Sequence, residues 1–105
     1  MKPGSEMDVA VARAVGWVVV SDGPSMTCIV EPASPHADKT RRPSTNVADA
    51  IAALGAAGLS FEIQWNIAFQ HWWVSINREE PSIFPTLPEA ACRAILVWAE
   101  AKEER

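Results

Sequence analysis

The chain has 105 residues, of which 49% are hydrophobic and 21% are charged, and its formal net charge is −4. This length suits one folded domain, and the composition is too apolar for an intrinsically disordered chain. The acidic balance disfavours nucleic-acid binding, which needs many Lys and Arg contacts to phosphates. We therefore expect a single domain, residues 1–105, without nucleic acid as its partner.

No stretch of the sequence is typical of a membrane span or a secretory signal. The apolar runs fall well short of the roughly 20 residues that cross a bilayer. Asp8 and Arg13 interrupt the stretch in which a signal peptide would carry no charge. These features predict a cytoplasmic protein.

The first predicted element is a helix over residues 6–15. Its apolar side chains recur at helical spacing, and Gly16 after it is a typical helix terminator. Ser5 and Asp8 have the spacing of a capping box, which predicts that they satisfy the first free amides of this helix.

A hairpin and a long loop are predicted next. Residues 17–20 and 26–30 are short runs rich in β-branched and apolar side chains, with a turn signal between them at residues 22–25. Residues 31–44 contain three prolines and little that is apolar, which predicts a proline-rich loop.

A second helix is predicted over residues 46–57, after a run of helix-capping side chains. Free backbone amides at a helix N-terminus attract anions, and basic side chains precede them here. A solvated basic loop is the simpler interpretation of this segment, and a site for a small anionic ligand such as a nucleotide phosphate is the alternative. The candidate binding residues are Lys39, Arg41, Arg42, Ser44 and Thr45.

The strongest pattern in the chain lies between residues 61 and 76. Apolar and polar residues alternate there with the period of a half-buried strand, and the phase shifts at His71. A single strand of this length would far exceed the usual length of about 5–6 residues. Two strands joined by a turn near residues 66–70 are therefore predicted.

Trp72 and Trp73 are adjacent in this segment, so their side chains must point to opposite faces of a strand. Either helices cover both faces of the sheet, or one tryptophan is exposed and available for binding. Trp72, Trp73 and the neighbouring His71 are therefore a candidate interaction surface.

The C-terminal part predicts a loop over residues 78–88 and a helix over residues 87–103. Thr86 and Glu89 have capping-box spacing, and a broad apolar stripe follows them. Three helices with about four mainly antiparallel strands predict the α+β class. Coverage of both sheet faces would make the domain a three-layer α/β/α sandwich.

No catalytic or metal-binding motif stands out. His36, His71, Cys28 and Cys92 lack the closely spaced pairs of zinc sites, and no orienting partner is evident for His36 with Asp38. Cys92 lies on an apolar helical stripe, where a buried free thiol is simpler than a disulfide. We expect no enzymatic activity, no metal and no cofactor.

Four segments occur in a characteristic order: Val15-Gly16-Trp17, Pro43-Ser44-Thr45-Asn46, Trp72-Trp73-Val74-Ser75-Ile76 and Thr86-Leu87-Pro88-Glu89-Ala90-Ala91-Cys92-Arg93-Ala94. Together they resemble the phage ABA sandwich domain family, and the last segment is the most specific of the four. The resemblance implies an α/β/α layered fold and a phage or prophage origin. It implies no enzymatic activity and carries over no functional residues. The chain departs from the family in the proline-rich segment 22–43.

These observations predict a phage or prophage accessory protein that acts by non-catalytic binding in the cytoplasm of the host bacterium. Its expected partner is a host or phage protein, and inhibition of a host anti-phage defence system is the expected role. The alternative is a small-molecule or nucleotide binder that uses the basic loop 39–42 and the helix start at 44–46.

Overall fold

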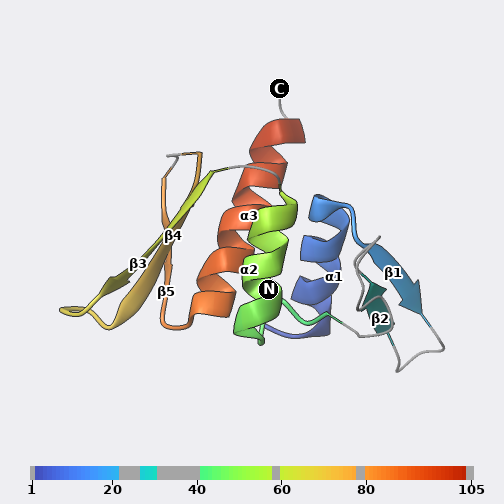
Figure 1. The fold of residues 1–105 in the computed structure, drawn as a ribbon, viewed down its shortest axis with the longest axis horizontal. Coiled ribbons are helices and arrows are strands. Elements are labelled where there is room, and N and C mark those ends of the chain that lie inside the picture. The colour runs from blue at the N-terminus through green and yellow to red at the C-terminus, as the bar shows by residue number, and fades with distance from the viewer. Residues whose placement is uncertain (1, 22–26, 31–40, 58–59, 78–79, 104–105) are drawn as a thin grey trace.

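The computed structural model describes residues 2–21, 27–30, 41–57, 60–77 and 80–103. In this part of the chain, three helices stand between two separate antiparallel sheets (Figure 1). The helices are α1 (Ser5–Val15), α2 (Val47–Ala56) and α3 (Leu87–Glu103). One sheet pairs β1 (Val18–Ser21) with β2 (Thr27–Val30), and the other has the order β3 (Phe61–Asn66), β4 (His71–Ile76) and β5 (Ser82–Phe84).

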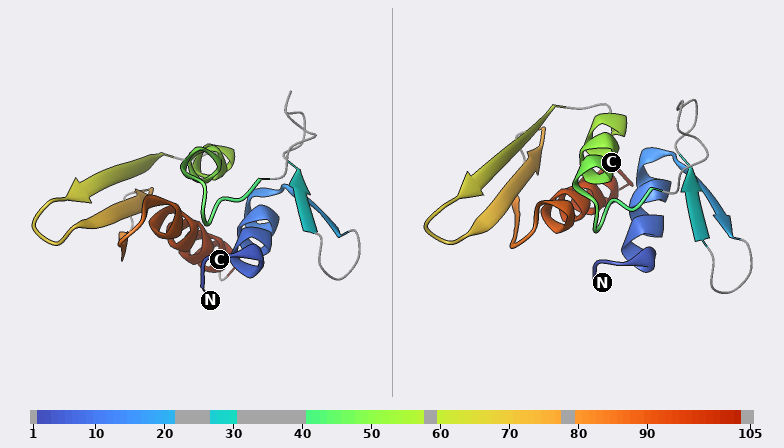
Figure 2. Two further views of the ribbon diagram at one scale, coloured as in Figure 1. Left: turned by 90° about the horizontal axis from the view of Figure 1, so that it is seen from below. Right: turned by 60° about the horizontal axis from the view of Figure 1, so that its bottom comes forward.

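The helices form the middle layer of the molecule (Figure 2). α3 packs against β4 and β5, α1 packs against the β1–β2 hairpin, and α2 lies against the other two helices. The α+β class with three helices is confirmed, whereas the α/β/α sandwich with one sheet of about four strands is not. The reason is strand pairing, because β1 and β2 pair only with each other among the described strands.

The predicted cap of α1 is wrong. Gly4 is the N-cap, and no side chain caps this helix. Asp8 is buried and instead accepts a hydrogen bond from the Ser44 amide at 2.7 Å, which ties α1 to the segment before α2. The Asp8 carboxylate therefore binds the Ser44 amide and not the free amides at the start of α1.

The other helix ends follow the sequence prediction. Gly16 ends α1 in the left-handed conformation at φ 83°, and the Asn46 side chain accepts from the Asp49 amide at the start of α2. The Glu89 amide donates to Thr86 Oγ1 at 3.4 Å before α3. Each of these predictions is confirmed, and each depends only on residues within one helical turn.

The hydrophobic core lies between the helices and one face of the three-stranded sheet. Many helix positions in it are alanine, which allows close approach of the helices; those fully buried are Ala12, Ala50, Ala53, Ala90 and Ala91. Larger side chains fill the remaining space, and they include Met7, Val11, Leu54, Val74, Ile76 and Ile95.

The register of β3, β4 and β5 assigns each side chain to one of two sheet faces. Trp72 lies opposite Trp65 on one side and Phe84 on the other, and it packs against the core. Trp73 lies between Gln64 and Ile83 on the opposite face. Because the described helices cover only the first face, the two tryptophans have different surroundings.

β5 was predicted to be part of a loop. It has only three residues, which is too short for a recognisable alternation. Pro81 and Pro85 flank it, as is common where a short strand lies at the edge of a sheet. The predicted turn at residues 22–25 and most of the predicted loop at residues 31–44 lie outside the described residues.

Candidate interaction surface

The turn between β3 and β4 is held by local hydrogen bonds. Asn66 Oδ1 accepts from the Phe69 amide at 3.1 Å, and His71 Nδ1 donates to the Phe69 carbonyl oxygen. Gln70 takes the left-handed backbone conformation at φ 52°. These contacts define the conformation of the turn and thereby the placement of its side chains.

This turn carries the two most exposed large apolar side chains among the described residues, Ile67 and Phe69. Ile67 is 80% exposed, Phe69 is 70% exposed, and Trp65 at the end of β3 is 43% exposed. We call these three residues the hairpin tip. The turn between β3 and β4 projects away from the helices, at one end of the longest axis of the molecule (Figure 1).

The sequence around the hairpin tip is free of charge. Residues 63–77 include none of the chain's 9 Lys and Arg or 13 Asp and Glu side chains. The polar neighbours Gln64, Asn66 and Gln70 are uncharged amides. Enrichment in aromatic residues and depletion of charge are typical of the core of a protein–protein interface, and grouped exposed apolar side chains mark interaction sites.

Trp65 connects the hairpin tip to the protein core. Its ring lies 5.0 Å from the ring of Trp72, with 50° between the two planes, which is a favourable tilted arrangement. Trp72 in turn packs against the core. Because this contact already orders the Trp65 ring, binding of a partner to Trp65 costs less conformational entropy than binding to a freely rotating side chain.

The predicted surface of His71, Trp72 and Trp73 is in the right hairpin, but the structure does not bring the three residues together. Trp72 lies on the inner face of the sheet, while His71 and Trp73 lie on the outer face. Trp73 is half-buried, and its buried indole Nε1 has no hydrogen-bond partner among the described residues. The more exposed residues of the hairpin tip were missed, because their alternation was interpreted as the buried face of a strand.

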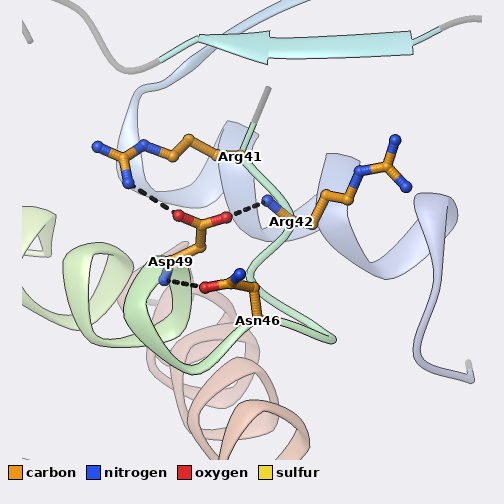
Figure 3. A network of polar contacts seen from close by, with 4 residues as sticks. All are labelled: Arg41, Arg42, Asn46 and Asp49. Atoms are coloured by element: carbon orange, nitrogen blue, oxygen red, sulfur yellow. Dashed lines mark hydrogen bonds and ion pairs between the residues drawn. The ribbon is translucent and has the colours of Figure 1, made fainter. Parts of the chain in front are cut away.

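The predicted anion site at the start of α2 contains a carboxylate of the chain itself (Figure 3). Arg41 Nη1 lies 2.8 Å from Asp49 Oδ1, and the Arg42 amide donates to Asp49 Oδ2 at 2.8 Å. Asp49 is in the first turn of α2 and is buried. Its carboxylate therefore takes the place that was predicted for an external anion.

The remaining residues of this predicted site face in different directions. Ser44 is buried, where its Oγ accepts from the Gly4 amide at 2.9 Å. Thr45 is exposed, and the exposed Arg42 side chain points away from Asp49 (Figure 3). Lys39 lies outside the described residues. Binding of an external anion here stays a prediction.

No group of three or more His, Cys, Asp or Glu residues could hold a metal ion in the described part of the chain. His36, one of the four residues considered for zinc, lies outside that part. Among the described helices, none is both long and apolar enough to cross a membrane.

Cys92 is a free thiol buried on α3. Burial, assisted by the negative charge of Asp8, raises the pKa of this thiol from 9.0 to about 12, although Arg93 acts in the opposite direction. Thiolates are the reactive form of cysteine. This thiol is therefore protonated and inert near neutral pH.

We expect the thiol of Cys92 to resist a disulfide reagent in the folded protein. In a Cys28→Ser variant, Cys92 is the remaining one of the two cysteines in the sequence. At pH 8 its thiol should not react in native buffer and should react in denaturant. Rapid native labelling would contradict the burial of Cys92. Between pH 9.0 and about 12 the unfolded chain binds fewer protons at this thiol than the folded chain, so stability should fall as pH rises.

The exposure and the hydrogen bonds of the turn identify the hairpin tip as a candidate interaction surface. The resemblance to the phage ABA sandwich domain stays a prediction. No family model, no curated protein and no solved structure matches the chain.

Proposed function

We propose that this chain is a non-catalytic binding protein that contacts a partner protein through the hairpin tip. The observation that carries this proposal is the exposure of Ile67 and Phe69 on an uncharged, hydrogen-bonded turn, next to the exposed Trp65 at the end of β3. Burial of one such side chain in a partner would contribute about 1.5–3 kcal/mol. A few anchors of this kind supply most of the binding energy of many interfaces.

The partner that fits the hairpin tip has an apolar pocket bordered by hydrogen-bonding groups. The exposed carbonyl and amide groups of Gln64 and Gln70 flank the apolar side chains and suit such a border. Because the rest of the chain is acidic, a basic surface around the pocket would also speed association.

The proposed partner is a host protein in the bacterial cytoplasm, and the proposed consequence is inhibition of a host anti-phage defence system. Support for this choice comes from the resemblance to phage ABA sandwich proteins. The size of the chain also suits a protein that occludes a site on a larger partner.

A pull-down from host lysate tests this proposal. We expect an immobilised wild-type chain to recover a specific protein, and the double variant Ile67→Ser/Phe69→Ser to lose it, with affinity reduced at least about 100-fold. The matched control is Val97→Ser, which makes the same kind of change at a 53% exposed apolar residue on α3.

Thermal unfolding should show that the double variant remains folded, because both side chains are largely exposed. Equal recovery of the same protein by the wild-type chain and the double variant would overturn the proposed surface. Recovery of no specific protein at all would count against a binding function.

A further inference from the structure

β3 has one edge that no described strand occupies, because β4 is its single neighbour in the sheet order. The pairing of β3 with β4 is regular along all six residues of each strand, and the Asn77 amide extends it by donating to the Ser60 carbonyl at 2.9 Å. Hydrogen-bonded pairs alternate along an antiparallel ladder, so Glu62 and Gln64, like Ser60, direct their backbone groups to β4. The backbone groups of Phe61, Ile63 and Trp65 therefore face the free edge.

This edge lacks the features by which proteins usually prevent pairing with another strand. β3 contains no proline, no lysine and no bulge, and its single charged residue is Glu62. A regular edge of this kind is a template for another strand.

The sequence of β3 is symmetric about Ile63 in the chemical class of its side chains. It reads aromatic, polar, aliphatic, polar, aromatic over Phe61-Glu62-Ile63-Gln64-Trp65. Two antiparallel copies centred on Ile63 would place Phe61 opposite Trp65 twice and Ile63 opposite Ile63. On the other face, Glu62 would lie opposite Gln64, so no two like charges meet.

We infer that two copies of this chain associate by antiparallel pairing of their β3 strands, with the two-fold axis at Ile63. The Ile63 amide of each copy donates to the Ile63 carbonyl of the other, and the two three-stranded sheets become one sheet of six strands. The symmetry of β3 favours a second copy over an unrelated strand, because an isologous contact requires a surface that complements itself.

The dimer and the proposed function share Trp65 of the hairpin tip but can be tested separately. Ile67 and Phe69 lie in the turn beyond β3, so strand pairing leaves them available for a partner. Loss of the dimer and loss of partner binding therefore need different substitutions and can be observed separately.

Sedimentation equilibrium of the full chain over a range of concentrations tests the dimer. We expect a species of twice the 11.4 kDa chain mass. Gln64→Glu places like charges opposite Glu62 at two points and should raise the dimer dissociation constant about tenfold. Gln64→Lys places opposite charges there and should lower it about tenfold. Because Gln64 is exposed, both variants should fold.

Amide hydrogen exchange identifies the pairing itself. On dimerisation, the amides of Phe61, Ile63 and Trp65 should become protected, whereas those of Glu62 and Gln64 should already be protected in the monomer. A chain that stays at 11.4 kDa at all concentrations would overturn the inference. A dimer that is insensitive to both Gln64 variants, or that leaves the Ile63 amide unprotected, would also overturn it.

Discussion

Replacing Trp72 by alanine is expected to lower the free energy of unfolding by about 3 kcal/mol. The Trp72 ring packs against the core, and it also contacts the Trp65 ring at 5.0 Å. The substitution would leave a cavity at the inner face of the sheet and remove the aromatic contact that orders the hairpin tip. Urea unfolding followed by circular dichroism measures this loss.

The matched control for this substitution is Trp73→Ala, the same change at the adjacent residue. Trp73 lies on the outer face of the sheet, opposite Ile83, which is 45% exposed. The described helices do not cover that face, so we expect a loss of no more than about 1 kcal/mol. Equal losses for the two variants would contradict the assignment of the faces.

Replacing Asp49 by alanine is also expected to cost about 3 kcal/mol. The Asp49 carboxylate contacts both the Arg41 guanidinium and the Arg42 amide at 2.8 Å, and its removal leaves these donors without this largely buried carboxylate. Because it bridges α2 to the segment that precedes it, the loss should also loosen that segment. Chemical denaturation gives the magnitude, and amide exchange at Arg42 gives the local effect.

One further variant separates the role of the Asp49 charge from that of its shape, and another is the control for the loss of an acidic side chain. Asp49→Asn keeps an acceptor for the Arg42 amide and should recover about half of the lost stability. Glu100→Ala removes an exposed acid from α3 and should change stability by no more than about 0.5 kcal/mol. If Asp49→Ala unfolds like the wild-type chain, the bridge does not stabilise the fold.

Asp49→Ala also gives a test of the predicted anion site. Acetate has the same carboxylate group as the missing side chain, so added acetate should raise the melting temperature of this variant and leave the wild-type value unchanged. A nucleotide that raises the wild-type melting temperature would instead support external anion binding at this helix start, with displacement of Asp49.

The helices were predicted within one or two residues because their signals are local. Helix α3 was predicted over 87–103 and observed over Leu87–Glu103, and Gly16 ends α1 as expected. The division of residues 61–76 into two strands is confirmed, since the shift of phase at His71 coincides with the start of β4. Each pattern depends on the repeat of a helix or strand, which neighbours in the sequence define.

The predicted cap of α1 failed because of a contact between residues far apart in the sequence. Asp8 was assigned to the cap of its own helix, but it binds the Ser44 amide, 36 residues away. The basic segment before α2 contacts Asp49 of the same chain, and its binding of an external anion stays a prediction. Nothing in the local pattern distinguishes a carboxylate of the same chain from one supplied by a ligand, because both satisfy the same donors.

The sequence alone therefore determined the α+β class, the helix bounds and the opposite orientations of Trp72 and Trp73, because backbone geometry and side-chain period dictate them. Only the tertiary structure decided that the helices form the middle layer, that Trp72 is the tryptophan of the pair that faces them, and that the hairpin tip projects from the body. These features depend on which strands pair and on which sheet each helix packs against. Packing over the whole domain decides them, and no local pattern encodes them.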